Sequence, residues 1–202
     1  MKAHQSSSRR GRAAVGALTG LAALLLAACG GTGGGSTGSS PAPSSAAPAK
    51  PPSAAAITVR SPAFAAGTMI PVRFSCRGSN TPIPLAWAGI PAGAASVAMI
   101  MDDPDAPSGT FTHWVVFNLP VTSRGITNGR LPAGAAQAQN GRGQAAYTGP
   151  CPPSGTHHYR FTVYAEPRKL PLQAGASLPA ALAAIRANPL ASGRLTGLFA
   201  SG

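Results

Sequence analysis

The chain has 202 residues and carries 16 Lys and Arg against 4 Asp and Glu, a formal charge of +12. Only 10% of the residues are charged, whereas 25 Gly and 21 Pro make up nearly a quarter of the length, which excludes a coiled coil or a long helical bundle. Beyond the first 28 residues the basic side chains are scattered and form no run, which argues against a nucleic-acid-binding protein.

The first 28 residues have the features of an export signal. A basic stretch ends at Arg12, and the apolar run that follows, residues 13–28, is shorter than the roughly 20 residues of a membrane-spanning helix. The run ends in Leu26-Ala27-Ala28-Cys29, which resembles the lipobox of bacterial lipoproteins, where the cysteine is acylated and becomes the new N-terminus. We therefore expect a lipidated Cys29 and a protein anchored on the extracytoplasmic face of the cell membrane. An ordinary secretory signal and an uncleaved anchor are the alternatives.

Residues 29–56 are expected to be a tether. The segment after Cys29 consists almost entirely of Gly, Ser, Thr, Ala and Pro, with Lys50 as its one charge. Such a composition buries too little apolar surface to offset the conformational entropy of the chain, so we expect disorder. A flexible linker of this length has a mean reach of about 30 Å.

Residues 57–202 are expected to form one mainly β domain. The β-prone windows are Ile57–Val59, Ser96–Met101, Trp114–Leu119, Tyr159–Ala165 and Arg194–Phe199, and Met69–Phe74 alternates weakly. Pro and Gly between these windows favour a β-sandwich over βαβ units. One helix is expected over Ala180–Ala187, with Ser177 as N-cap and Pro179 in the first turn, ending before Pro189.

Acidic residues gather directly after the second of these windows. Asp102, Asp103 and Asp105 are three of the four acids in the chain. Asp and Pro favour turns for local reasons, so an acidic turn is the plain alternative. Close carboxylates repel one another unless histidines or cations lie opposite. His113 precedes the Trp114 strand, and a neighbouring carboxylate can fix its tautomer and make it more basic.

A second group of unusual residues spans Tyr147 to Tyr159. Its Gly and Pro residues predict an irregular loop, in which glycine lets backbone N–H groups approach a ligand closely. His157 and Tyr159 are two residues apart on a predicted strand and share one face, with His158 on the other. The alternative is a loop with structural histidines.

Together these residues resemble the phosphatidylethanolamine-binding protein family, in its bacterial, Raf-kinase-inhibitor-like branch. The matching residues are Asp103–Pro107, His113–Val116 with Asn118 and Pro120, Tyr147, Gly149–Pro153, His157 and Tyr159, with weaker matches at Ser61–Phe64, Pro84–Trp87 and Asn188–Ala191. The resemblance covers essentially all of residues 57–202.

The resemblance implies a sandwich of two antiparallel sheets with a short C-terminal helix and a small pocket for phosphate-like anions. It implies that the pocket is lined by Asp103, Asp105, His113, His157 and Tyr159, with Pro107, Tyr147, Gly149, Cys151 and Pro152 at its rim. The expected ligands are phosphorylated small molecules or phospholipid head groups, without a cofactor. A phosphoethanolamine head group offers an anion to the donors and an ammonium to a carboxylate.

Other function classes have less support. The chain has no Gly-x-Ser-x-Gly, Walker, Cys-x-x-Cys or His-Glu-x-x-His motif, and Gly141–Ala146 imitates a dinucleotide fingerprint without a preceding strand. An inhibitor of a protease or kinase, acting through the pocket surface, is the main alternative. A hydrolase using Ser108 or Ser154, and a metal site, are further alternatives. The metal ligands would be Asp103, Asp105, His113 and His157.

Two cysteines remain besides Cys29. In an oxidising, extracytoplasmic setting Cys76 and Cys151 are expected to form a disulfide that braces the Gly-Pro loop. Two free buried thiols are the alternative.

Overall fold

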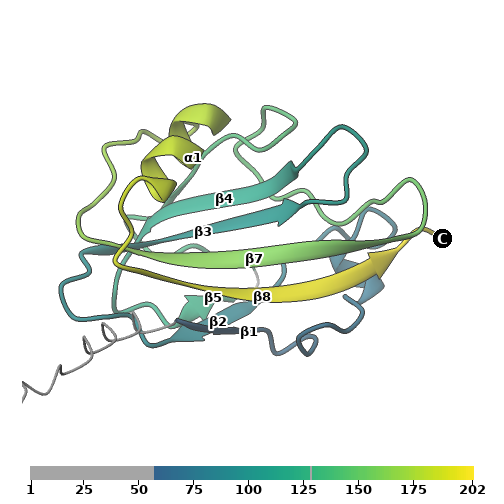
Figure 1. Cartoon of the computed structure of the whole chain (residues 1–202), viewed down its shortest axis with the longest axis horizontal. Helices are drawn as coiled ribbons and strands as arrows, with labels where there is room; N and C mark the ends of the chain where they lie inside the picture. Colours follow the sequence, from purple (N-terminus) through teal and green to yellow (C-terminus); the bar gives the residue numbers. More distant parts are fainter. Residues whose placement is uncertain (1–56, 128) are drawn as a thin grey trace, which may run out of the picture. The chain divides into compact units, whose positions relative to one another are not determined.

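Two antiparallel sheets form the framework of the described chain, residues 57–127 and 129–202 of a computed structural model (Figure 1). The smaller sheet has the order β1-β2-β5, formed by Thr58–Arg60, Leu85–Ala88 and Gly125–Ile126. The larger sheet has the order β6-β4-β3-β7-β8, formed by Ala136–Gln137, Phe111–Leu119, Ser96–Asp103, Thr156–Glu166 and Ala191–Ala200. One helix, α1 (Leu178–Arg186), and a 3-10 turn, Val72–Phe74, complete the fold. The predicted mainly β fold class is confirmed.

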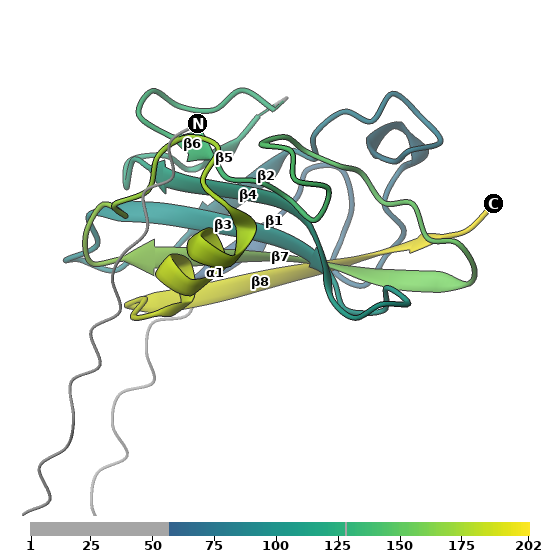
Figure 2. The same cartoon turned by 90° about the horizontal axis from the view of Figure 1, so that it is seen from above.

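The larger sheet is covered on both faces, by α1 on one side and by the smaller sheet on the other (Figures 1 and 2). Successive side chains of a strand point to opposite faces. On β3, Val97 and Met99 therefore pack in the core between the sheets, while Ala98 and Ile100 pack with Ile185 of α1. This double coverage explains why β3 is apolar from Val97 to Met101 and is buried along its whole length.

The long elements begin and end close to the predicted bounds. The helix begins at Leu178 and ends at Arg186, with Ser177 at the N-cap position, although its side chain makes no capping hydrogen bond. The strand suggested by the weak alternation of Met69–Phe74 is wrong, because only Met69 bridges to Leu198 and Pro71 leads into the 3-10 turn.

The predicted signal peptide, the lipidated Cys29 and the tether fall in residues 1–56, outside the described residues. Among the residues that are described, no helix is both long enough and apolar enough to cross a bilayer.

Candidate functional site

A cavity of about 150 Å³ opens at the end of the larger sheet where β3 ends and β4 and β7 begin. We call it the Asp103 cavity. Its lining residues are Asp103, Ala106, Pro107, Phe111, His113, Arg142, Thr148, Gly149, Cys151, Pro152, Pro153, His157 and Tyr159. The fold therefore brings the end of β3, the start of β7 and two loops around one space.

A buried aspartate–histidine pair forms one wall of the Asp103 cavity. Nδ1 of His157 lies 2.8 Å from Oδ2 of Asp103, and both side chains are buried. The other oxygen of Asp103 accepts the N–H of Asp105 at 2.9 Å. Since a carboxylate accepts hydrogen bonds, Nδ1 of His157 carries a proton, and Nε2 is the ring nitrogen left for a ligand.

His113 of β4 is held differently. Its Nδ1 donates to the carbonyl oxygen of Thr148 at 2.8 Å, and its ring packs edge-on against Phe111 and Tyr159 at centroid distances of 4.8 and 5.2 Å. Burial lowers the pKa of His113, and the Thr148 carbonyl and the Asp103 carboxylate oppose that shift. A neutral His113 with Nδ1 protonated presents Nε2 as an acceptor.

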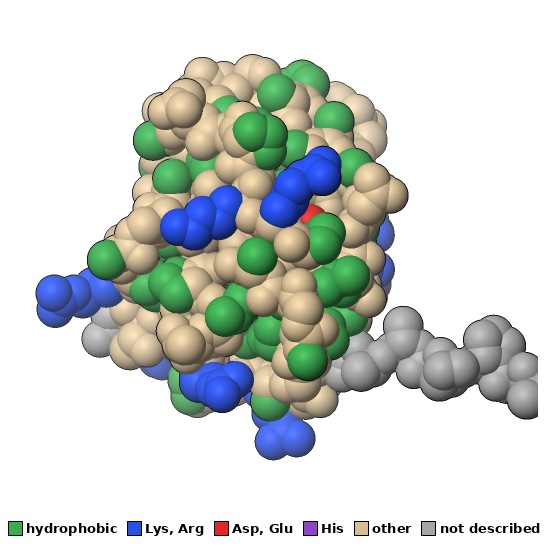
Figure 3. Space-filling view, turned by 90° about the vertical axis from the view of Figure 1, so that its left-hand side faces the viewer, with side chains coloured by type: hydrophobic (Ala, Val, Ile, Leu, Met, Phe, Trp, Pro, Cys, Tyr) green, Lys and Arg blue, Asp and Glu red, His purple; other side chains and the backbone are tan. Residues whose placement is uncertain are grey.

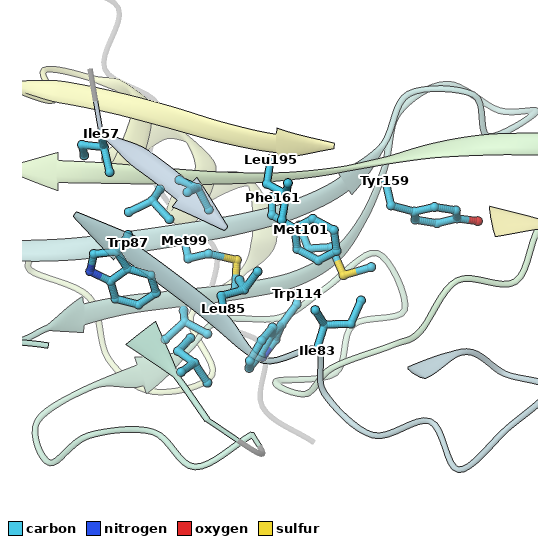
Figure 4. Packing of buried hydrophobic residues seen from close by; sticks show 14 of the residues in the cluster. Ile57, Ile83, Leu85, Trp87, Met99, Met101, Trp114, Tyr159, Phe161 and Leu195 are labelled. Atoms are coloured by element: carbon cyan, nitrogen blue, oxygen red, sulfur yellow. The ribbon is translucent and has the colours of Figure 1, made fainter. Parts of the chain in front are cut away.

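Tyr159 offers a free hydroxyl. The residue belongs to the core between the sheets, and Figure 4 shows it at the edge of the cluster with its hydroxyl directed away from the other labelled side chains. This hydroxyl is buried and finds no hydrogen-bond partner within the described part of the chain. Burial, and then the negative charge of Asp103, raise the pKa of Tyr159. The phenol therefore remains a hydrogen-bond donor.

The Gly-Pro loop is tied to the chain around residue 76. The predicted disulfide between Cys76 and Cys151 is confirmed, and the Cys76 N–H donates to the Pro150 carbonyl at 3.1 Å. The N–H of Gly149 donates to Oδ1 of Asn80 at 2.9 Å, so this amide is not free for a ligand as the loop composition suggested. A Cβ at Gly149 would collide with the Phe74 carbonyl oxygen, which is why the close approach of the two segments requires glycine.

Two of the predicted site residues do not line the Asp103 cavity. Asp105 is exposed and pairs with His158, whose ring nitrogen lies 2.8 Å and whose backbone N–H lies 2.7 Å from Oδ2 of Asp105. That backbone hydrogen bond is the main reason why the pKa of Asp105 is lowered. Tyr147 donates to the Phe74 carbonyl at 2.7 Å and stacks edge-on against Trp114. These contacts make Tyr147 part of the packing around the core between the sheets.

The third aspartate of the acidic cluster serves the other face of the sheet. Asp102 accepts two hydrogen bonds from the guanidinium of Arg160, at 2.7 and 3.0 Å, and Arg186 of α1 lies 3.7 Å away. The cluster therefore does not act as one group. Asp102 joins β7 and α1, Asp103 faces the cavity and Asp105 caps the start of β7.

The arrangement gives little support to the metal and hydrolase alternatives. Within residues 57–127 and 129–202, no three His, Cys, Asp or Glu side chains are placed to hold a metal ion. Neither Ser108 nor Ser154 is among the residues that line the cavity, and both are exposed.

The sequence patterns missed several lining residues, of which Arg142 is the one with a charge. It belongs to a Gly-, Ala- and Gln-rich stretch with no periodicity, so no pattern marked it. Phe111 and Thr148 were also missed, although each lies within two residues of a predicted site residue.

Comparisons with known proteins agree with this description. The sequence matches the family model described as "Phosphatidylethanolamine-binding protein" over residues 60–200, a range that includes every residue lining the cavity. A Mycobacterium tuberculosis protein named "Putative lipoprotein LppC" is 45% identical over 150 residues, which are 73% of this chain and 74% of that protein.

Two further similar chains are matched along their whole length. A Methanothermobacter thermautotrophicus protein named "UPF0098 protein" is 44% identical over 151 residues, which are 72% of this chain and 100% of that protein. The crystal structure of E. coli YbcL, described as a new member of the mammalian PEBP family, superposes with a TM-score of 0.68 at 32% identity, covering 73% of this chain and 100% of that one.

Proposed function

Because the chain belongs to the phosphatidylethanolamine-binding protein family, we propose that it is a binding protein whose Asp103 cavity holds the phosphate group of a small molecule or of a phospholipid head group. The observation that carries the proposal is the meeting of two buried histidines, a buried carboxylate and a phenol without a hydrogen-bond partner among the described residues around one small cavity. Buried polar groups without partners are costly, and a ligand that supplies acceptors would satisfy them.

The proposed binding chemistry is hydrogen bonding to phosphate oxygens. The Tyr159 hydroxyl donates directly, and His157 donates through Nε2 when its ring is protonated. Asp103 holds His157 in the orientation that this contact requires. Ligand binding in this proposal makes and breaks no covalent bond and uses no cofactor.

We further propose the domain organisation that the sequence predicts. Residues 1–28 are a lipoprotein signal peptide, Cys29 is lipidated, residues 29–56 are the tether, and residues 57–202 are the binding domain on the extracytoplasmic face of the membrane. The name of the mycobacterial relative supports the lipoprotein assignment. The Methanothermobacter relative, which is matched along its whole length, indicates that the domain also occurs without such an extension.

Calorimetric titration of phosphoethanolamine tests the proposed ligand class. We expect the wild-type chain to bind and His157→Gln to bind at least about tenfold more weakly, because a charge-assisted hydrogen bond is lost while the amide can still donate to Asp103. His158→Gln is the matched control, since His158 is exposed and pairs with Asp105 outside the cavity. Absence of binding to wild type, or equal affinity of the two histidine variants, would contradict the proposal.

A further inference from the structure

One permanently charged cation, the exposed side chain of Arg142, lines the cavity, and nothing in the sequence patterns assigns it a role. Arg142 lines the Asp103 cavity together with His157 and Tyr159. Within the described residues its guanidinium takes part in none of the ion pairs, in contrast to Arg160 and Arg186, which serve Asp102. An arginine stays protonated at any physiological pH, so this charge does not depend on the state of the histidines.

The loop that carries Arg142 is organised by one buried amide. Asn140 is 2% exposed, and its Oδ1 accepts the N–H groups of Arg142 at 2.8 Å and Gln144 at 3.2 Å. Its Nδ2 donates to the Ala146 carbonyl at 2.9 Å and to Oγ1 of Thr148 at 3.0 Å. All the hydrogen-bonding groups of the Asn140 side chain are therefore spent on shaping the loop beside the cavity.

The same loop is fastened to β4. The Gly141 N–H donates to the Thr112 carbonyl at 2.8 Å, and a Cβ at Gly141 would lie 2.6 Å from the Phe111 ring. A larger residue at 141 would therefore require the loop or the Phe111 ring to shift. The loop that carries Arg142 is thus held by the Gly141 backbone and by the buried side chain of Asn140. These contacts fix the backbone of Arg142 beside the cavity.

The other ionisable groups that line the cavity differ from Arg142 in their surroundings. The carboxylate of Asp103 is paired with His157. Burial, and to a smaller extent the positive charge of Arg142, lower the pKa of His113, which favours its neutral form. Arg142 is therefore the one cavity-lining side chain that is positively charged at every physiological pH, and within the described residues it makes no ion pair.

We propose that Arg142 makes the Asp103 cavity selective for phosphomonoesters over phosphodiesters. This inference rests on the proposed function and narrows it, because phospholipid head groups are diesters whereas many soluble metabolites are monoesters. A monoester presents three terminal oxygens, which match the Arg142 guanidinium, the Tyr159 hydroxyl and the His157 ring, and a diester presents two. The monoester also carries close to two negative charges at pH 7.5, and the fork of an arginine suits two of its oxygens at once.

The test compares phosphoethanolamine, a monoester, with glycerophosphoethanolamine, a diester, by calorimetry on the full-length chain in mild detergent at pH 7.5. We expect the wild-type chain to prefer the monoester by at least about tenfold. Arg142→Gln should lose about that factor for the monoester and less than about twofold for the diester, so that the selectivity disappears. Arg142→Lys should keep part of the monoester affinity, because it retains the charge without the fork.

Arg130→Gln is the matched control, because it removes the same charge from an exposed arginine outside the Asp103 cavity. Its affinities for both ligands should equal those of the wild type. Binding of the monoester with no loss in Arg142→Gln, or wild-type affinities that are equal for the two esters, would overturn the role of Arg142 while leaving the proposed function intact. If the wild-type chain binds neither ester, both the proposed function and the role of Arg142 are overturned.

Discussion

Two aspartate–histidine pairs lie at the same end of the domain and differ in their surroundings. Both have an oxygen–nitrogen distance of 2.8 Å, but the side chains of His157 and Asp103 are 9% and 5% exposed, whereas those of His158 and Asp105 are 56% and 40% exposed. An exposed ion pair contributes little to stability, while removing one partner of a buried pair leaves a costly charge. The pair of Asp103 is therefore the one that the fold depends on and that a ligand would perturb.

Glu166 is a buried acid that the proposed function does not use. It closes β7, is 2% exposed, and its Oε1 has no hydrogen-bond partner among the described residues. Burial raises the pKa of Glu166 to about 7, against an opposing effect of Arg168. Since this pKa lies above the ordinary value of 4.5, the folded chain keeps the proton in a pH range where the unfolded chain has lost it.

We expect this acid to make the domain less stable as the pH rises from about 4.5 to about 7, with the full cost present above that range. Glu166→Gln should remove the cost, raising the free energy of unfolding at pH 8 by on the order of 2–3 kcal/mol relative to its effect at pH 4. Urea denaturation of both proteins at the two pH values measures it. An equal effect of the substitution at both pH values would contradict the role of ionisation.

At the scale of elements, the sequence predicted the long strands, which have strong periodicity. It missed the short strands, which depend on tertiary contacts. The strands β3, β4 and β7 were recognisable because two covered faces or one buried face leave a long apolar or alternating pattern. The strands β2, β5 and β6 have two to four residues each, too few for a pattern, and their pairing partners define them.

The same distinction holds for the candidate site. His113, His157 and Tyr159 could be predicted because they lie next to or within periodic strands, and a strand places alternate residues on one face. Arg142 could not, because its position depends on the hydrogen bonds of Asn140 across a loop. Asp105 was assigned to the cavity from its motif. In the structure its carboxylate instead hydrogen-bonds to the backbone N–H and the ring of His158, at the start of β7.

The disulfide joins two otherwise irregular segments next to the cavity. Cys76 and Cys151 are 75 residues apart, so the bond restricts a large loop in the unfolded chain. In the chain-entropy description we expect the double variant Cys76→Ser/Cys151→Ser to lose about 4 kcal/mol of unfolding free energy, measured by urea denaturation. Dithiothreitol should lower the stability of the wild type towards that of the variant and leave the variant unchanged. A reductant effect on the variant would show that another process is being measured.

At the scale of the whole molecule, the excess of positive charge is spread out. In Figure 3 the Lys and Arg side chains lie apart from one another among apolar and neutral groups on the face shown. A nucleic-acid-binding surface would gather them in a patch or stripe, so this face agrees with the scattered basic residues of the sequence. The proposed attachment to a membrane is through Cys29, in the first part of the chain.

Metabolic labelling with a palmitate analogue tests that attachment. We expect the wild-type chain, produced in a bacterial host, to carry the label and to begin at Cys29, whereas Cys29→Ala carries none. The variant Cys76→Ser/Cys151→Ser is the control and should still be labelled, because its two cysteines lie in the folded domain. Label retained by Cys29→Ala, or a mature chain that begins elsewhere, would contradict the lipoprotein assignment.

The pleat of β3 directs the side chains of two adjacent aspartates to opposite faces of the sheet. This restricts insertions and deletions within the strand. Asp102 serves the helix-covered side through Arg160, and Asp103 serves the cavity through His157. Deleting or inserting a single residue within Ser96–Asp103 would turn each aspartate to the opposite face of the sheet. Arg160 and His157 would then both lose their carboxylate partners. Changes of length in homologous chains should accordingly fall in the turns on either side, while substitutions at Asp102 can accumulate independently of ligand preference.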